Sequence, residues 1–137
     1  MRVVLDTNVL LSAILSEKSV PARVLEGWYR RKFTLLSSLE QIEEVKRVSR
    51  YPHLASRLSA ARAGRLVNDL RDVATFVTDL QSFDISADPF DNYLIAMVDA
   101  GNADYLVSGD KADLLALGKH GGARIISVRE FATVLAL

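Results

Sequence analysis

Four acidic side chains stand where the chain could bring carboxylates together. Asp6 and Asp110 each follow a short apolar stretch, Asp91 stands near a predicted helix start, and Glu44 precedes an apolar helical position. Carboxylates that lie close together raise each other's pKa unless a cation balances them. Mg²⁺ and Mn²⁺ relieve that conflict because they prefer oxygen ligands, and a pair of such ions about 4 Å apart can support hydrolysis of a phosphodiester. The acids therefore predict metal-dependent hydrolysis.

Each acid also has a purely structural explanation. Asp91 and Asp110 could cap helices and complement the positive ends of their dipoles. Glu44 could stay in water, and because Glu40 and Glu43 lie on the same predicted helix, periodicity alone does not select it. The carboxylate that directly follows the first strand needs a partner in any case. Helix caps explain acids one at a time, but not why two of them follow parallel strands at the same edge.

Length and composition predict a single domain over residues 1–137 with ordinary globular content, since half the residues are apolar and a quarter are charged. No apolar run approaches the roughly 20 residues that span a bilayer, and we expect no signal peptide before the first strand. We therefore expect a cytoplasmic protein without a membrane segment. The chain has no cysteine, which excludes disulfides, thiolate metal sites and a thiol nucleophile.

The formal net charge is zero, but the two signs are unevenly distributed. Residues 23–65 carry ten Lys or Arg against four Glu, a balance of +6, and residues 66–137 carry five against eleven Asp or Glu, a balance of −6. One interpretation is a chance fluctuation among solvated helix faces. The other is a basic surface beside an acidic pocket, which suits a polyanion held over metal ions.

The elements that must position the acids alternate along the chain. Apolar and β-branched runs predict strands at 2–5, 33–36, 75–78, 105–107 and 124–126. Helical patterns and caps predict helices at 9–15, 19–31, 38–50, two within 54–74, 88–101, 110–118, and one from 127 onward. This alternation predicts an α/β fold with a mostly parallel sheet covered on both faces. Residues that directly follow the strands then gather at the carboxyl edge, where such folds build their sites.

Several local features make these predictions specific. Ser37 with Glu40, and Ser127 with Glu130, predict capping boxes at two helix starts. A loop is expected over 119–122. The predicted core positions of the helices within 38–74 are Leu39, Ile42, Val45, Val48, Leu66, Leu70 and Val73.

Four segments together resemble the PIN-domain ribonucleases. They read VLDTN at 4–8, SLEQIEEV at 38–45, DPFDN at 88–92 and ADYLVSGDK at 103–111. The resemblance covers nearly the whole chain in the right order, and it is greatest to the prokaryotic group assigned as toxins of toxin–antitoxin pairs. It implies a three-layer α/β/α sandwich with about five strands in the order 3-2-1-4-5.

The resemblance also implies Mg²⁺- or Mn²⁺-dependent cleavage of single-stranded RNA. The family's catalytic and metal-binding acids fall on Asp6, Glu44, Asp91 and Asp110. Asn8 and Ser108 match its supporting polar positions, with serine where threonine is common, and Asp113 is a further acid that could instead cap its own helix. As partners, the resemblance implies an RNA substrate, an antitoxin protein and a homodimer or higher homo-oligomer.

Contacts to RNA are expected from the basic half of the chain. The candidates for backbone contacts are Arg23, Arg30, Arg31, Lys32, Lys46, Arg47 and Arg50. Tyr29 and Tyr51 could stack bases, whereas Trp28 is expected in the core and His53 and His120 at the surface.

Two other functions stay open from the residues themselves. The first is a phosphohydrolase with Asp6 as covalent nucleophile, which is disfavoured because Asn8 stands where such enzymes usually place a second acid. The second is a non-catalytic domain that binds RNA or protein. A nucleotide-binding module is weaker still, because no G-x-G-x-x-G or G-x-x-x-x-G-K-[ST] motif is present.

Overall fold

The computed structural model describes residues 1–81, 92–109 and 112–137, and in this part of the chain one sheet has six strands in the order β3-β2-β1-β4-β6-β5. The strands are β1 (Arg2–Leu5), β2 (Thr34–Ser37), β3 (Thr75–Phe76), β4 (Tyr105–Ser108), β5 (Lys119–His120) and β6 (Ala123–Ser127). Neighbouring strands are parallel except β5 and β6. The predicted order is confirmed, with β6 as its fifth strand.

The sixth strand was not expected, because residues 119–122 were predicted to form a loop. The chain instead reverses at Gly121, whose φ of +56° favours glycine, and β5 pairs antiparallel with the start of β6. The outcome is a short hairpin added to one edge of the predicted sheet.

The helices largely follow the predicted pattern. They are α1 (Thr7–Leu15), α2 (Val20–Tyr29), α3 (Leu39–Ser49), α4 (Pro52–Ala55), α5 (Ala60–Asp72), α6 (Asn92–Gly101), α7 (Ala112–Leu117) and α8 (Val128–Val134). The capping box of Ser127 and Glu130 at α8 is confirmed. The predicted helix starts at 88 and 110 lie outside the described residues.

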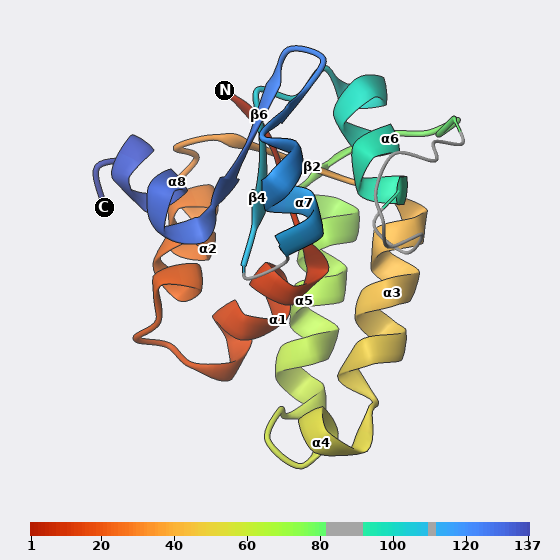
Figure 1. The fold of residues 1–137 in the computed structure, drawn as a ribbon. Helices are drawn as coiled ribbons and strands as arrows, with labels where there is room; N and C mark the ends of the chain where they lie inside the picture. The colour runs from red at the N-terminus through yellow and green to blue at the C-terminus, as the bar shows by residue number, and fades with distance from the viewer. Residues whose placement is uncertain (82–91, 110–111) are drawn as a thin grey trace.

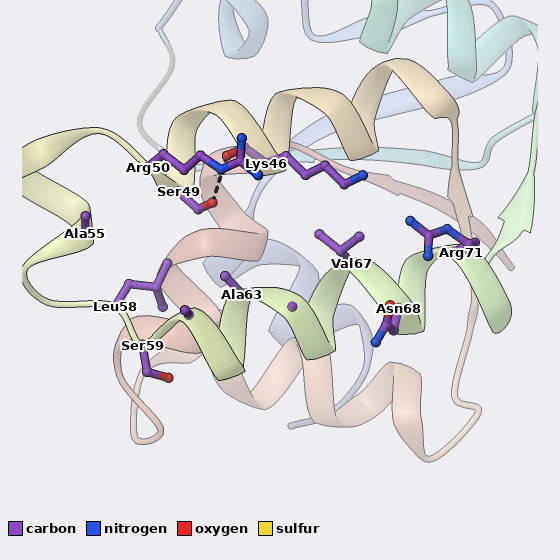
Figure 2. Close-up of a pocket in the computed structure, with 12 residues that line it drawn as sticks. Lys46, Ser49, Arg50, Ala55, Leu58, Ser59, Ala63, Val67, Asn68 and Arg71 are labelled. Atoms are coloured by element: carbon purple, nitrogen blue, oxygen red, sulfur yellow. Dashed lines mark hydrogen bonds between the residues drawn. The ribbon is translucent and has the colours of Figure 1, made fainter.

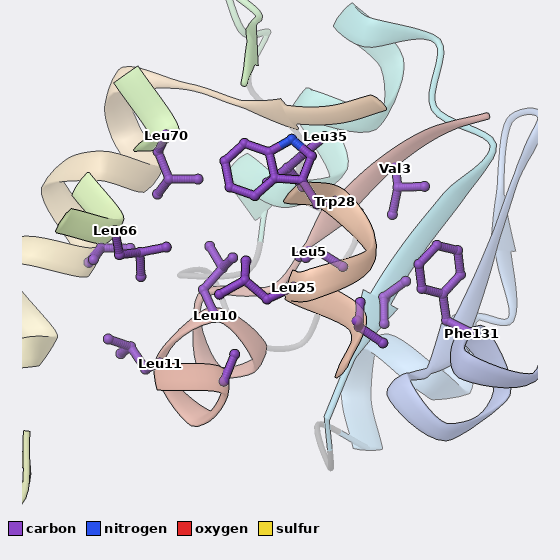
Figure 3. Packing of buried hydrophobic residues seen from close by; sticks show 14 of the residues in the cluster. Val3, Leu5, Leu10, Leu11, Leu25, Trp28, Leu35, Leu66, Leu70 and Phe131 are labelled. Carbon is purple, nitrogen blue, oxygen red and sulfur yellow. The ribbon is translucent and has the colours of Figure 1, made fainter. Parts of the chain in front are cut away.

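The sheet is the middle of three layers (Figure 1). Alternate residues of β1 point to opposite faces, so that Val3 and Leu5 join one apolar cluster and Val4 joins the other. The first cluster packs α1, α2, α3, α5 and α8 against one face, and Figure 3 shows Trp28 of α2 within it. The second packs α6 and α7 against the other face. This is the predicted sandwich, and Trp28 is a core residue, as expected.

Three local predictions were wrong. The N-cap of α3 is Ser38, which accepts from the N–H of Gln41, because Ser37 is still the buried last residue of β2. With the helix starting there, Leu39 occupies its first position and is 60% exposed. Val73 is 62% exposed because it follows the last residue of α5, outside the helical stripe that Leu66 and Leu70 continue into the core.

Beyond the sheet, α3 and α5 lie side by side and α4 joins them at their far end (Figure 1). In the described part of the chain, no helix has both the length and the apolar character needed to cross a bilayer. The first helix of the pair, α3, carries Glu44 to the carboxyl edge of the sheet.

Candidate active site

Buried polar side chains of the described residues gather at the carboxyl edge of the sheet. Each of them ends or follows β1, β2 or β4, or lies in the first turn of α3: Asp6, Thr7, Ser37, Ser38, Gln41 and Ser108. Burying polar groups costs free energy unless they are hydrogen-bonded. Their concentration at one edge marks a built site, because the rest of the described core is apolar.

Asp6 is at the centre of this edge. It directly follows β1, the strand between β2 and β4, and its side chain is 1% exposed. One carboxylate oxygen accepts from the hydroxyl of Ser108 at 3.2 Å, and the other accepts from the backbone N–H of Asn8 at 3.3 Å. These bonds fix the orientation of a buried carboxylate, and they make Asp6 the N-cap of α1 as well.

The start of α3 is tied to the same edge by Gln41. Its amide group donates to the carbonyl oxygen of Leu5 at 2.6 Å, while its side-chain oxygen accepts from the hydroxyl of Ser37 at 2.8 Å. The hydroxyl of Ser38 donates to the sulfur of Met97 in α6. These contacts connect β1, β2, α3 and α6, so they determine where the next turn of α3 places its side chains.

Glu44, on that next turn, reaches the edge through a tyrosine. The hydroxyl of Tyr93, in the first turn of α6, donates to Oε1 of Glu44 and lies 2.9 Å from the hydroxyl of Thr7. The other oxygen of Glu44 is 3.7 Å from the guanidinium of Arg47. Because Glu40 and Glu43 are exposed, Glu44 is the glutamate of α3 that faces the residues beside Asp6.

The Tyr93 phenol is held in its neutral form. Burial raises the pKa of Tyr93 far above its usual value, and the charge of Glu44 and the hydrogen bond to it raise that pKa further. The nearby charge of Asp6 acts in the same direction. Tyr93 therefore serves as a hydrogen-bond donor at this edge, not as an anion.

The remaining predicted site residues fall into two groups. Ser108 contacts Asp6 as expected, and Asn8 contributes its backbone N–H while its side chain is exposed. Asp91 and Asp110 lie outside the described residues, and Asp113 is on α7 with its side chain outside them too: these three stay predictions.

Three residues of the edge had no predicted role: Thr7, Gln41 and Tyr93. Thr7 lies within the VLDTN segment, and Tyr93 directly follows the DPFDN segment. Their position next to predicted acidic ligands was therefore the signal that could have pointed to them. Gln41 also stood in a quoted motif, but its contacts depend on how α3 meets the end of β1, so its role was not predicted.

Two of the predicted RNA-binding residues line a groove of about 620 Å³ between α3 and α5. Figure 2 shows Lys46 and Arg50 on α3 opposite Arg71 on α5, with aliphatic side chains such as Val67 between them. The described residues that line the groove include these three cations and no acid. On a helix, Lys46 and Arg50 lie on the opposite side from Glu44, so α3 separates the groove from the carboxyl edge.

The other basic and aromatic residues that were predicted to bind RNA do not gather at one place on the surface. Arg30 pairs with Glu26 at 3.0 Å, Arg47 lies beside Glu44, and Arg23, Arg31 and Lys32 are on or beside α2. Tyr29 and Tyr51 are about two-fifths exposed, and the hydroxyl of Tyr29 donates to Asp69 at 2.6 Å. His53 is exposed, and His120 is partly buried beside Asp99.

The donor chemistry of the edge fits a hard divalent cation. Asp6 and Glu44 offer carboxylate oxygens, which are the ligands that hard cations prefer. The side chains that lie beside them at the described edge carry hydroxyl and amide groups, and the one sulfur there is that of Met97 beside Ser38. Among the residues described, no group of three or more acids and histidines comes together. A complete ligand set would therefore need acids outside them.

Comparison with known proteins agrees with this geometry. Residues 2–112 match the PIN domain family, whose members are generally nucleases that use divalent metal ions. The chain is also 25% identical over 118 residues to an uncharacterized protein of Methanocaldococcus jannaschii, which covers 85% of this chain and 75% of that protein. With an acid-bearing carboxyl edge on a parallel sheet, and a match over most of its length, the chain belongs to the PIN-domain family.

Proposed function

We propose that this PIN domain is a Mg²⁺- or Mn²⁺-dependent endoribonuclease that hydrolyses phosphodiester bonds of single-stranded RNA. The observation that carries the proposal is the buried carboxylate of Asp6 at the centre of the carboxyl edge, with Glu44 brought to the same edge by Tyr93. A carboxylate buried at this edge is stabilised in its ionised form when a cation binds there. The family match supports a nuclease, and the carboxylate oxygens of Asp6 and Glu44 support the choice of cation.

The roles of the residues follow from their chemistry. Asp6 and Glu44, with the predicted ligands Asp91 and Asp110, would hold the cation. When bound, the cation would lower the pKa of water and offset negative charge on the phosphate. Ser108 and the N–H of Asn8 keep the Asp6 carboxylate in one orientation, which avoids reorganisation when the substrate arrives. Hydrolysis by water is expected to leave 5′-phosphate and 3′-hydroxyl ends.

A cleavage assay with matched acid variants tests the proposal. Wild type should cut an unstructured RNA in Mg²⁺ or Mn²⁺, more readily than a structured one. Asp6→Asn and Glu44→Gln should lower kcat/KM by about 100-fold or more, since several kcal/mol of stabilisation are lost. Glu43→Gln is the matched control: it changes an exposed glutamate of the same helix and should cut like wild type.

Four outcomes would contradict the proposal. Wild type that cuts neither RNA, or Asp6→Asn that cuts as well as wild type, excludes Asp6-dependent nuclease activity. RNA binding without cleavage would favour the non-catalytic alternative, and a phosphorylated Asp6 would favour the phosphohydrolase. The toxin role, the antitoxin partner, the homo-oligomer, the single domain over 1–137 and the cytoplasmic location stay predictions.

A further inference from the structure

The hydroxyl of Tyr93 is shared by side chains from three helices. Tyr93 has one hydroxyl hydrogen, and it donates that hydrogen to Oε1 of Glu44. The contact of 2.9 Å with Thr7 must then be a bond that Thr7 donates. The result is an ordered series of hydrogen bonds, from Thr7 on α1 through Tyr93 on α6 to Glu44 on α3.

Glu44 has a second partner on its own helix. The guanidinium of Arg47 lies 3.7 Å from Oε2, and its side chain is 54% exposed while that of Glu44 is 15% exposed. A glutamate on a helix surface has several accessible rotamers, and an ion pair three residues on can hold one of them. Of these two contacts, the bond from Tyr93 is the one that ties the carboxylate to Thr7, the residue that follows Asp6.

We propose that Tyr93 is a positioning residue of the site, which holds the Glu44 carboxylate near Thr7, the residue that follows Asp6, and so raises the affinity of the edge for a divalent cation. This inference rests on the proposed function, because it gives Glu44 a place in the cation site. Tyr93 acts through Glu44, with Thr7 fixing the phenol in turn. Neighbours that orient ligands in this way are typically worth 10–100-fold in metal affinity.

A second tyrosine provides a matched control. The hydroxyl of Tyr29 donates to the Asp69 carboxylate at 2.6 Å, the same kind of bond, but it joins α2 to α5 away from the carboxyl edge. Tyr29→Phe and Tyr93→Phe each delete one phenol oxygen and one bond to a carboxylate. They differ in whether that carboxylate belongs to the site.

The test is a double-mutant cycle read by Mn²⁺ binding in isothermal titration calorimetry, with melting temperature as the check on folding. Tyr93→Phe should weaken Mn²⁺ affinity by about 10-fold. In a Glu44→Gln background the same change should have no further effect, because its route to the cation is gone. Tyr29→Phe should bind Mn²⁺ like wild type. In RNA cleavage at low Mn²⁺, Tyr93→Phe should lower kcat, leave KM for RNA unchanged and recover as Mn²⁺ is raised.

Other results would overturn the inference. If Tyr93→Phe binds Mn²⁺ like wild type, or weakens binding equally with and without Glu44, Tyr93 does not act through Glu44. Should Tyr93→Phe fail to fold, Thr7→Val removes the bond that fixes the phenol, and unchanged Mn²⁺ affinity in that variant overturns the inference. Wild type that binds no Mn²⁺ and cuts no RNA contradicts the proposed function itself. If wild type binds Mn²⁺ and cuts RNA, and Tyr93→Phe does both equally well, only the role of Tyr93 is contradicted.

Discussion

At the scale of single residues, a tyrosine hydroxyl bonded to a carboxylate occurs twice in the described chain, in two settings. Tyr93 binds Glu44 in a partly buried place beside Asp6, and Tyr29 binds Asp69 on the surface. In both, burial is the main cause that raises the pKa of the phenol, and the carboxylate adds to it. The Tyr29–Asp69 pair isolates the effect on stability, because it lies away from the carboxyl edge.

Tyr29 should make the protein lose stability at alkaline pH. Its pKa is raised in the folded state, so above the unfolded value of about 10 the unfolded chain releases a proton that the folded chain keeps. The stabilisation is fully present below that pH and is lost as pH rises toward the folded pKa. Urea unfolding at pH 9, 10 and 11 should therefore show a shallower decline for Tyr29→Phe than for wild type. Equal slopes would contradict this assignment.

The sequence allowed prediction of residues whose place follows from one strand or helix. Asp6 and Ser108 lie at the ends of neighbouring parallel strands, so their contact follows from strand order alone. Tyr93 and Gln41 could not be predicted, because their partners come from separate elements whose angles depend on packing. Ser38 was missed as a cap for a smaller reason, since two adjacent serines offered the same chemistry one residue apart.

At the scale of elements, the approach of α6 to β2 depends on a glycine. A Cβ added to Gly101, the last residue of α6, would lie 2.5 Å from Leu36 of β2 and 2.9 Å from Val77. Leu36 is fully buried, and valine is stiff at χ1, so neither can move away without disturbing the core. The helix therefore lies close to the sheet only because this position has no side chain.

Gly101→Ala should destabilise the fold by about 1–3 kcal/mol, the usual cost of overpacking a core. Gly64→Ala is the matched control, because a Cβ there meets nothing within 4 Å and the position is inside α5. That change should stabilise the protein by up to about 1 kcal/mol through helix propensity. Chemical denaturation of both variants measures the difference, and equal midpoints would show that the contact at Gly101 relaxes freely.

At the scale of the whole molecule, the basic segment of the sequence covers more than one surface. Residues 23–65 run from α2 through α3 and α4 into α5, and their cations face several directions. Of the predicted RNA-binding residues, Lys46 and Arg50 share a groove with Arg71, which the charge count had placed in the acidic half. Charge along the sequence predicted a basic surface, but only the packing of α3 against α5 determines which cations lie together.

RNA length should decide whether the groove contributes to binding. The groove and the carboxyl edge lie on opposite sides of α3, which is about 10–12 Å across, so a strand of about 3 nucleotides at the edge is too short to reach the groove, whereas one of about 20 can reach both. Because the groove lacks aromatic lining residues among those described, its contacts should be to phosphates and should depend on salt.

The double variant Arg50→Ala/Arg71→Ala tests this dependence by fluorescence anisotropy with labelled RNA of both lengths. It should bind the long RNA several-fold more weakly than wild type. The slope of log affinity against log salt concentration should be shallower by about 0.7 for each phosphate that the variant no longer neutralises. The short RNA should be bound and cut as by wild type. Arg124→Ala/Arg129→Ala is the control of equal charge, since β6 and α8 lie across the molecule from α3 (Figure 1). If both double variants weaken binding equally, net charge and not the groove is responsible. If neither does, RNA does not enter the groove.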